Sequence, residues 1–470
     1  MSHLSSSQFN ELKAKATELF ESNDNWKSVC VCRKEVAGKE TGDVCIALQV
    51  LNKQPLNEID EQDRFPESIT LSDGTKVPTD VQITDSLDFY ALASCYTLPD
   101  PSANPNTWVM PVSGNRSTQR PIQGGLSVGI MPPAGYGGGS VATGTLGGVA
   151  IDLQDGTLVG VSNSHVIAGN TFAGGKVGAY RNSNGLVYWS FLSANDTTPS
   201  SGEDEFPIYQ QSSYDKFSST KSVLDPLKIG GVKRAYPFNT SGNKVDVACF
   251  AFDDTSLDTS EVVDTSTSWK QYLLDYSSPQ EWATDAEIDS LLTTESGAPV
   301  FRSGRTEGPV GWPGSDPYGS SACSLSAYAV SSNANINYSG NLGTISFTNQ
   351  IYVRGNTDAV TGGDSGSFIS ALFNASNPAL SAWKVIGLVY AGNNSSMSYA
   401  ICNRITDVAN MFSLSAWMGE ERPLRYTHRD IQVIESRSTA LTAMIGGKMY
   451  WQAGSTGFAS TTSFDTPPEE

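Results

Sequence analysis

A single carboxylate lies inside an apolar, strand-like segment near the middle of the chain, and any fold must provide for it. The residue is Asp246, in the run Val245-Asp246-Val247-Ala248-Cys249-Phe250. Burying a charge is costly unless the charge is hydrogen-bonded or paired. Two interpretations are open: Asp246 faces water at a strand edge, or it is held by a specific partner inside the protein.

Histidine is scarce in this chain, which contains only His3, His165 and His428. His165 follows the strand-like apolar run 158–162 and the small polar residues Asn163 and Ser164. A sheet can hold a histidine at such a position while its ring faces a cleft. Taken alone, His165 could equally be a strand-end histidine whose hydrogen bonds are satisfied within the sheet.

The segment 361–367, Thr-Gly-Gly-Asp-Ser-Gly-Ser, carries a candidate nucleophile, Ser365. A serine hydroxyl needs a neighbouring base and a place for negative charge before it can attack a carbonyl group. The surrounding glycines suit a tight turn in which the backbone N–H groups of Gly363 and Ser365 point at one spot. Such donors would stabilise an oxyanion. A plain Gly/Ser loop is the alternative in a chain with 44 glycines.

The three residues occur in the order His165, Asp246, Ser365, which is the order in chymotrypsin-type triads. This order differs from that of the α/β-hydrolases. Ser367 also stands where their G-x-S-x-G motif requires glycine.

The sequence resembles the chymotrypsin-fold serine proteases, most closely the bacterial branch typified by α-lytic protease and the streptogrisins. The resemblance covers roughly residues 122–415. It implies two six-stranded β-barrels with an active site between them. Five segments in the right order carry it: Ser164-His165-Val166, Val245–Ala248, Gly363–Gly366, Phe301–Gly308 and Gly387–Asn393.

The resemblance implies a role for each residue of the site. His165 would be the general base, Asp246 would orient it, and Ser365 would form an acyl-enzyme. The N–H groups of Gly363 and Ser365 would form the oxyanion hole. Arg302 would pair with Asp364, with Arg305 as the alternative partner, so that no zymogen cleavage would be needed to supply that charge.

The resemblance also indicates a substrate pocket. Its floor would be Ala359 with Val360 beside it, and the far wall would come from Tyr390, Ala391 and Gly392. No carboxylate or cation is evident there unless Asp358 turns inward, so a neutral, small apolar side chain is expected. Many relatives carry serine where this chain has Tyr390. That departure keeps open the alternative of a catalytically silent binding or structural protein on the same fold.

The expected fold class is mainly β, with further units around the barrels. An amphipathic helix is predicted for 1–25, because Phe9, Leu12, Ala16, Leu19 and Phe20 share one face, and Ser5 with Gln8 suits a capping box. A small α+β module (26–100) has strands at 28–36, 44–51 and 76–84 and a short helix at 55–63. A linker (101–121), the protease domain (122–418) and an extension of unknown role (419–470) follow.

Composition restricts the partners. The net charge of −19 argues against nucleic acid and anionic membranes, which require a basic face. The N-terminus lacks the apolar run of a signal peptide, and no stretch is long enough to span a membrane. Without an export signal, the seven scattered cysteines are expected to be reduced. They form no C-x-x-C pair and histidines are few, so we expect no metal and no cofactor. The sequence predicts an intracellular, cytoplasmic protein that acts on proteins or peptides.

Overall fold

A computed structural model describes the greater part of the chain. The described residues are 4–37, 39–84, 89–92, 94–97, 107–109, 116, 122, 124–130, 140–168, 176–181, 187–192, 207–212, 216–218, 227–236, 242–252, 281–292, 299–306, 308–310, 325–338, 343–355, 360–373, 383–393, 399–416, 431–437, 440–445, 448–453 and 458–460.

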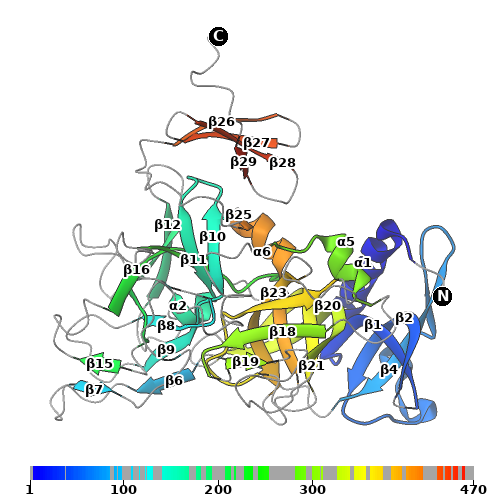
Figure 1. Ribbon diagram of the computed structural model, residues 1–470. Coiled ribbons are helices and arrows are strands. Elements are labelled where there is room, and N and C mark those ends of the chain that lie inside the picture. Colours follow the sequence, from blue (N-terminus) through cyan, green and yellow to red (C-terminus); the bar gives the residue numbers. More distant parts are fainter. Residues whose placement is uncertain are drawn as a thin grey trace.

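The expected fold class is confirmed: the chain is mainly β, with two large sheets in the manner of a two-barrel chymotrypsin-like fold (Figure 1). The larger sheet contains a ring of six antiparallel strands, because β18 pairs with both β22 and β20. The strands of this ring are β18 (Pro299–Gly304), β22 (Phe368–Leu372), β23 (Trp383–Asn393), β24 (Tyr399–Arg404), β21 (Gly343–Gly355) and β20 (Leu325–Tyr338).

The other large sheet is built mainly from residues that precede this ring in the sequence. Its nine strands, in spatial order, are β25 (Leu414–Ala416), β10 (Gly148–Asp152), β11 (Leu158–Ser162), β17 (Ala248–Phe252), β16 (Lys228–Ala235), β14 (Pro207–Tyr209), β8 (Ser127–Ile130), β9 (Ser140–Thr145) and β6 (Ser94–Thr97). Strand β25 comes last in the sequence, after β24 of the larger sheet and helix α6 (Ile405–Phe412). The chain therefore returns from the larger sheet to the nine-stranded sheet.

The N-terminal segment extends the larger sheet rather than forming a sheet of its own. Strand β1 (Ser28–Val36) pairs with β20, so β1, β2 (Lys39–Val50), β4 (Lys76–Ile83) and β3 (Ser68–Thr70) continue it. Helix α1 (Ser6–Ser22) buries Phe9, Leu12, Ala16 and Phe20, and Ser5 forms the expected capping box with Gln8. The helix expected at 55–63 is instead two short 3-10 turns, Leu56–Glu58 and Glu61–Asp63.

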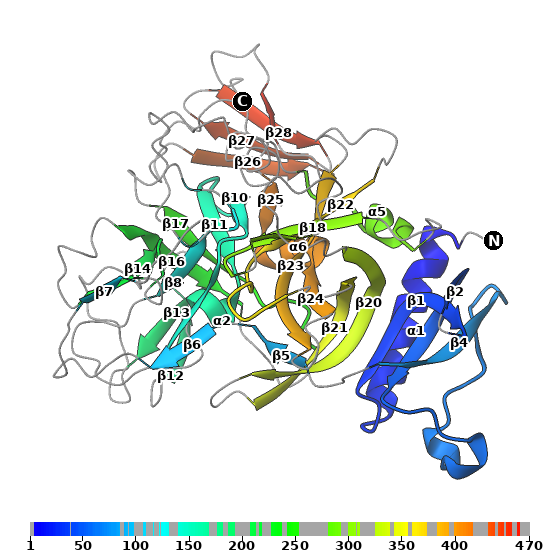
Figure 2. The ribbon, with the colours of Figure 1, turned by 60° about the horizontal axis from the view of Figure 1, so that its bottom comes forward.

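One short strand of the N-terminal segment lies apart from the others. Strand β5 (Phe89–Ala91) pairs with the C-terminal ends of β23 and β20 (Figure 2). The next strand in the sequence, β6, belongs to the nine-stranded sheet. The chain therefore passes from one sheet to the other between β5 and β6.

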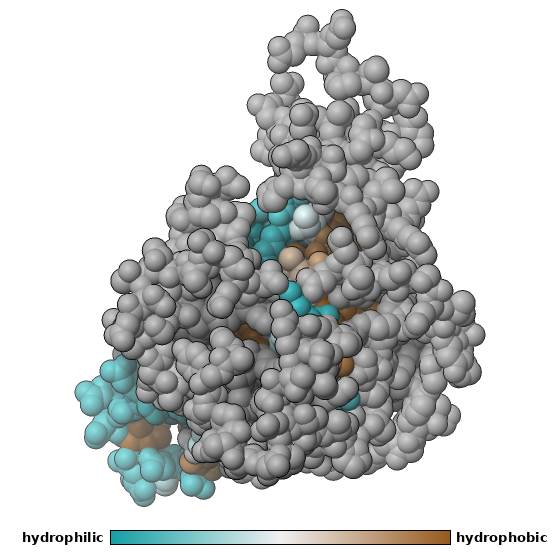
Figure 3. Space-filling model, turned by 90° about the vertical axis from the view of Figure 1, so that its left-hand side faces the viewer, coloured by the Kyte–Doolittle hydropathy of each residue, from teal (hydrophilic) through white to brown (hydrophobic). Residues whose placement is uncertain are grey.

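Smaller elements complete the described part of the chain: α2 (Ser164–Ile167), α5 (Asp285–Ser290), β7 (Thr107–Val109), β12 (Lys176–Arg181), β13 (Val187–Leu192), β15 (Lys216–Ser218), β19 (Gly308–Val310), β26 (Ile431–Arg437), β27 (Ala440–Ile445), β28 (Lys448–Ala453) and β29 (Phe458–Ser460). Strands β26 to β29 form a sheet of their own. Among the described residues, no helix has the length and apolar character needed to cross a membrane. The described hydrophobic residues visible in Figure 3 form small patches with hydrophilic residues beside them.

Candidate active site

The two large sheets bring together three residues that are far apart in the sequence. His165 lies in α2, one short step after the end of β11, and Asp246 lies just before β17. Both therefore come from the nine-stranded sheet, in which β11 and β17 are neighbours. Ser365 lies in the turn before β22 of the larger sheet. The site is thus assembled where the two sheets face one another.

The side chains of these residues form a hydrogen-bonded chain. His165 Nδ1 lies 2.5 Å from Asp246 Oδ2, and His165 Nε2 lies 3.0 Å from Ser365 Oγ. The backbone N–H of His165 also donates to Asp246 Oδ1, at 3.2 Å. All three residues are buried. The imidazole is therefore fixed on one side by a carboxylate and presents its other nitrogen to the serine hydroxyl.

The turn that carries Ser365 depends on glycine at two positions. Gly363 has φ = +99° and Gly366 has φ = +93°, a backbone conformation that side-chain-bearing residues rarely adopt. A Cβ atom on Gly366 would also overlap the Thr145 carbonyl oxygen and Ser162 Oγ. The Gly366 N–H donates to the Val389 carbonyl at 2.8 Å, which ties this turn to β23.

The aspartate before the nucleophile is held by a buried ion pair. Arg302 Nη2 lies 3.0 Å from Asp364 Oδ2, and both side chains are completely buried. Backbone N–H groups of Thr306 and Thr361 donate to the same carboxylate at 2.9 and 3.0 Å. Gly304 leaves room for the pair, because a Cβ there would overlap Asp364 Oδ1. Arg305 points elsewhere: its Nε donates to Ser127 Oγ at 3.2 Å.

Asp246 receives a further hydrogen bond that sequence reasoning missed. The hydroxyl of Tyr338, at the end of β20, donates to Asp246 Oδ2 at 2.8 Å. Burial, with the nearby Asp246 charge adding to it, raises the pKa of Tyr338 well above its ordinary value, so the phenol keeps its proton. No local motif marks Tyr338, because it contacts a residue 92 positions away.

Other contacts of Asp246 were also missed. Its backbone N–H donates to Asn403 Oδ1 at 3.0 Å, and its carbonyl accepts from Asn163 Nδ2 at 2.7 Å. By contrast, the Tyr390 hydroxyl is buried and has no hydrogen-bond partner among the described residues. The hydroxyl group that reaches Asp246 thus comes from Tyr338 and not from Tyr390.

The described pocket residues gather beside Ser365. Val360, Tyr390 and Ala391 are buried, and a Cβ on Gly392 would lie 2.6 Å from Val360 Cγ1. The Tyr390 carbonyl oxygen accepts a hydrogen bond from Ser365 Oγ at 3.0 Å. Asp358 and Ala359, the two residues that concern the pocket floor, lie outside the described residues.

One of the two N–H groups expected in the oxyanion hole already has a partner. The Gly363 N–H lies 2.5 Å from the carbonyl oxygen of Leu92, the residue that follows β5. The Leu92 N–H in turn donates to the Tyr390 carbonyl at 3.0 Å. A segment from the N-terminal part of the chain therefore lies against the candidate active site.

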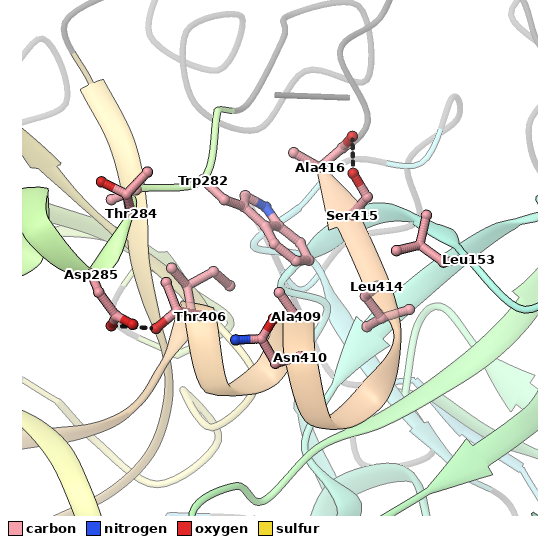
Figure 4. A pocket seen from close by; sticks show the side chains of 12 residues that line it. Leu153, Trp282, Thr284, Asp285, Thr406, Ala409, Asn410, Leu414, Ser415 and Ala416 are labelled. Atoms are coloured by element: carbon pink, nitrogen blue, oxygen red, sulfur yellow. Dashed lines mark hydrogen bonds between the residues drawn. The ribbon is translucent and has the colours of Figure 1, made fainter. Parts of the chain in front are cut away.

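A separate cavity of about 390 Å³ lies beside α6 and contains none of the predicted site residues. Trp282, Ala409 and Leu414 line it, with Asp285 and Thr406 at one side (Figure 4). Asp285 is engaged there by Arg404 Nε and by the Thr406 hydroxyl. Among the residues that the structure describes, no group of three or more histidine, cysteine, aspartate or glutamate side chains could hold a metal ion.

Comparisons with known proteins give matches only among solved structures. No protein-family model and no curated protein matches the chain. Thermobifida fusca protease A is 14% identical with a TM-score of 0.31, and the match covers 63% of this chain and 99% of that one. Nocardiopsis protease is 15% identical with a TM-score of 0.29, covering 63% and 98%. The active form of the Rv3671c protease from M. tuberculosis is 12% identical with a TM-score of 0.29, covering 65% and 83%.

Proposed function

We propose that this chain is a trypsin-like serine endopeptidase that cleaves peptide bonds through an acyl-enzyme intermediate. The observation that carries the proposal is the position of His165 between Asp246 and Ser365, at 2.5 and 3.0 Å. A base within hydrogen-bond reach of a nucleophile, itself oriented by a third group, is the arrangement that acyl transfer requires. Proteins or peptides are the substrates that this chemistry would act on.

In the proposed mechanism each residue has one task. Ser365 Oγ attacks the carbonyl carbon while His165 Nε2 takes the hydroxyl proton. Asp246 holds the proton on Nδ1 and stabilises the imidazolium that forms. The N–H groups of Gly363 and Ser365 stabilise the oxyanion. His165 then gives its proton to the leaving amine, and water releases the acyl group by the same steps in reverse.

Two acceptors compete for the single hydroxyl proton of Ser365. His165 Nε2 and the Tyr390 carbonyl oxygen both lie 3.0 Å from Ser365 Oγ. Only the arrangement in which the proton points at Nε2 prepares the hydroxyl for attack. A donor that occupies the Tyr390 carbonyl would therefore favour the reactive arrangement, and the backbone N–H of a bound substrate is such a donor.

A fluorophosphonate probe tests this function directly, because it reacts only with an activated serine. We expect the full chain to be labelled at Ser365, with the site located by peptide mass spectrometry. Ser365→Ala should abolish labelling, and His165→Ala should slow it on the order of 10⁴- to 10⁶-fold. Ser370→Ala is the matched control, since it removes a buried hydroxyl further along β22 and should label normally.

The effects of the two catalytic substitutions on the rate of hydrolysis should not be additive. Because Ser365 and His165 act as one unit, Ser365→Ala combined with His165→Ala should hydrolyse a peptide substrate about as slowly as either single variant. Labelling at another serine, or substantial hydrolysis by either single variant with its fold intact, would overturn the assignment and favour a silent binding protein.

A further inference from the structure

Strand β5 occupies the position of an additional strand along β23. Ala91 pairs with Ala391, Tyr90 with Gly392 and Phe89 with Asn393, all antiparallel. An extended peptide that adds to a sheet edge in this way is held by main-chain hydrogen bonds, while pockets accept alternate side chains. The partner segment, 390–393, is the one that borders Ser365 and forms the wall of the candidate pocket.

The backbone of Leu92 continues this ladder into the catalytic residues. Its N–H donates to the Tyr390 carbonyl at 3.0 Å, the carbonyl that also accepts from Ser365 Oγ. Its own carbonyl oxygen lies 2.5 Å from the Gly363 N–H. The backbone of Leu92 is therefore bonded both to the carbonyl that Ser365 Oγ contacts and to a proposed oxyanion donor.

This placement depends on the register of β5. Backbone carbonyl groups along a strand point alternately to opposite sides, so a shift by one residue would turn the Leu92 carbonyl away from Gly363. Covering the edge of β23 does not by itself require the Leu92 carbonyl oxygen to meet the Gly363 N–H.

The side chains of the segment also match the cleft. Leu92 is buried, and a Cβ built on Gly392 would lie 3.2 Å from Leu92 Cδ1 and 2.6 Å from Val360 Cγ1, so the Leu92 side chain packs at the candidate pocket wall. Phe89 is buried against Tyr352, with ring centroids 5.5 Å apart. Tyr90, between them in the strand, is 39% exposed. Counted back from the Leu92 carbonyl, the cleft thus buries the first residue, Leu92, and the fourth, Phe89.

We propose that the chain is its own substrate and that Ser365 cleaves the peptide bond that follows Leu92, within the same molecule. This inference rests on the proposed serine endopeptidase function and names its first substrate. The products are residues 1–92 and residues 93–470, and the new N-terminal sequence is Ala93-Ser94-Cys95-Tyr96.

The step consumes one water molecule and needs no other reactant. Ser365 Oγ bonds to the Leu92 carbonyl carbon, and its proton passes to His165. The bond to the Ala93 nitrogen then breaks, and that nitrogen receives the proton from His165. Water next attacks the Leu92 ester, gives a proton to His165 and displaces Ser365 Oγ, which recovers the proton. The Leu92 carboxylate and the Ala93 amine remain.

The experiment follows the purified full chain by intact-mass measurement and N-terminal sequencing. We expect the native chain to yield the two pieces with Ala93 at the new N-terminus, and Ser365→Ala to stay intact. The first-order rate should not change over a 100-fold range of protein concentration, since the reaction is intramolecular. For the same reason, native protein added to Ser365→Ala should leave that variant uncut.

A matched pair of variants tests the role of Leu92. Leu92→Glu places a charge at a buried apolar position and should slow self-cleavage by about 100-fold or more. It should still be labelled by a fluorophosphonate at Ser365, whereas Ser365→Ala should not be labelled. Ile83→Glu adds the same charge to the same piece at a residue that is 59% exposed, and it should cleave like the native chain.

The outcomes separate the two proposals. An intact native chain that is labelled at Ser365 overturns self-cleavage and leaves the protease proposal standing. A cut at another bond, or a cut in Ser365→Ala, also overturns self-cleavage at Leu92. If neither the native chain nor Leu92→Glu is labelled or cleaved, both proposals fail.

Discussion

Among single residues, Asp246 is held by several hydrogen bonds to its buried carboxylate. Its carboxylate accepts from the ring and the backbone N–H of His165 and from the Tyr338 hydroxyl. Hydrogen bonds to a buried charge offset the cost of removing it from water. The lone carboxylate that made this strand unusual in the sequence is therefore satisfied by groups from β20 and α2, which lie far away in the chain.

Tyr338→Phe should weaken catalysis without abolishing it. A hydrogen bond to a charged group is worth about 1.5–3 kcal/mol, so we expect kcat/KM for a peptide substrate to fall about 10- to 100-fold. Because burial raises the pKa of Tyr338 well above its ordinary value, the native hydroxyl keeps donating as the pH rises through the alkaline range. The loss should therefore be the same at pH 7 and pH 9.

Tyr390→Phe is the matched control for stability. Its hydroxyl is buried with no partner among the described residues, so removing it should leave the melting temperature unchanged or raise it. Tyr338→Phe should lower the melting temperature. Equal shifts in the two variants would show that the hydrogen bond to Asp246 has no special value.

The ion pair behind the nucleophile gives a second prediction. Arg302→Met leaves the Asp364 carboxylate buried without its cation, which should cost about 3–5 kcal/mol in the free energy of unfolding and reduce activity. Arg302→Met combined with Asp364→Asn removes both charges and should recover part of that stability. Denaturant unfolding measures both effects. An unchanged midpoint in the single variant would rule out Arg302 as the stabilising partner.

The sequence was informative about residues whose chemistry is rare in the chain. His165, Asp246 and Ser365 could be singled out because histidines are few, a carboxylate interrupts an apolar run, and glycines flank a serine. Tyr338 and Leu92 carry no such mark, since tyrosine and leucine are ordinary strand residues. Their positions follow from pairing between β20, β5 and β23, which no local pattern reveals.

At the scale of elements, the strands with strong apolar patterns were predicted well. The expected strands 28–36 and 76–84 correspond to β1 and β4, Ser28–Val36 and Lys76–Ile83. Their membership in the larger sheet was missed. The first six residues of β1 are all buried, and such unbroken burial indicates a strand covered on both faces rather than one at the surface of a separate module.

The capping box of α1 gives a prediction at this scale. Ser5 Oγ accepts from the Gln8 N–H at 3.3 Å, and Gln8 Oε1 accepts from the Ser5 N–H at 2.7 Å. Ser5→Ala should therefore lower the free energy of unfolding by about 1 kcal/mol. Ser7→Ala, within the helix and exposed, should be neutral or slightly stabilising. Equal effects of the two substitutions in thermal unfolding would contradict the role of the cap.

For the whole molecule, self-cleavage after Leu92 would not by itself free the cleft. Residues 1–92 contribute α1 and strands β1 to β5, and β1 pairs with β20 along five residue pairs. Lys13 Nζ lies 2.9 Å from Asp289 Oδ2, and Arg33 donates to the carbonyl groups of Leu291 and Leu292. The cut piece therefore has an extensive interface that holds Leu92 beside Ser365.

We expect the two pieces to elute together from a sizing column in native buffer. While they are associated, the Leu92 carboxylate should inhibit hydrolysis of an added peptide, so turnover should rise as the piece 1–92 dissociates. Lys13→Glu opposes the Asp289 carboxylate across the interface and should weaken association on the order of 10- to 100-fold. Lys15→Glu is the control, because Lys15 pairs only with exposed Glu18 within the helix among the described residues. Pieces that separate readily in the native protein, or a turnover that does not change with dissociation, would show that the N-terminal segment does not regulate the cleft.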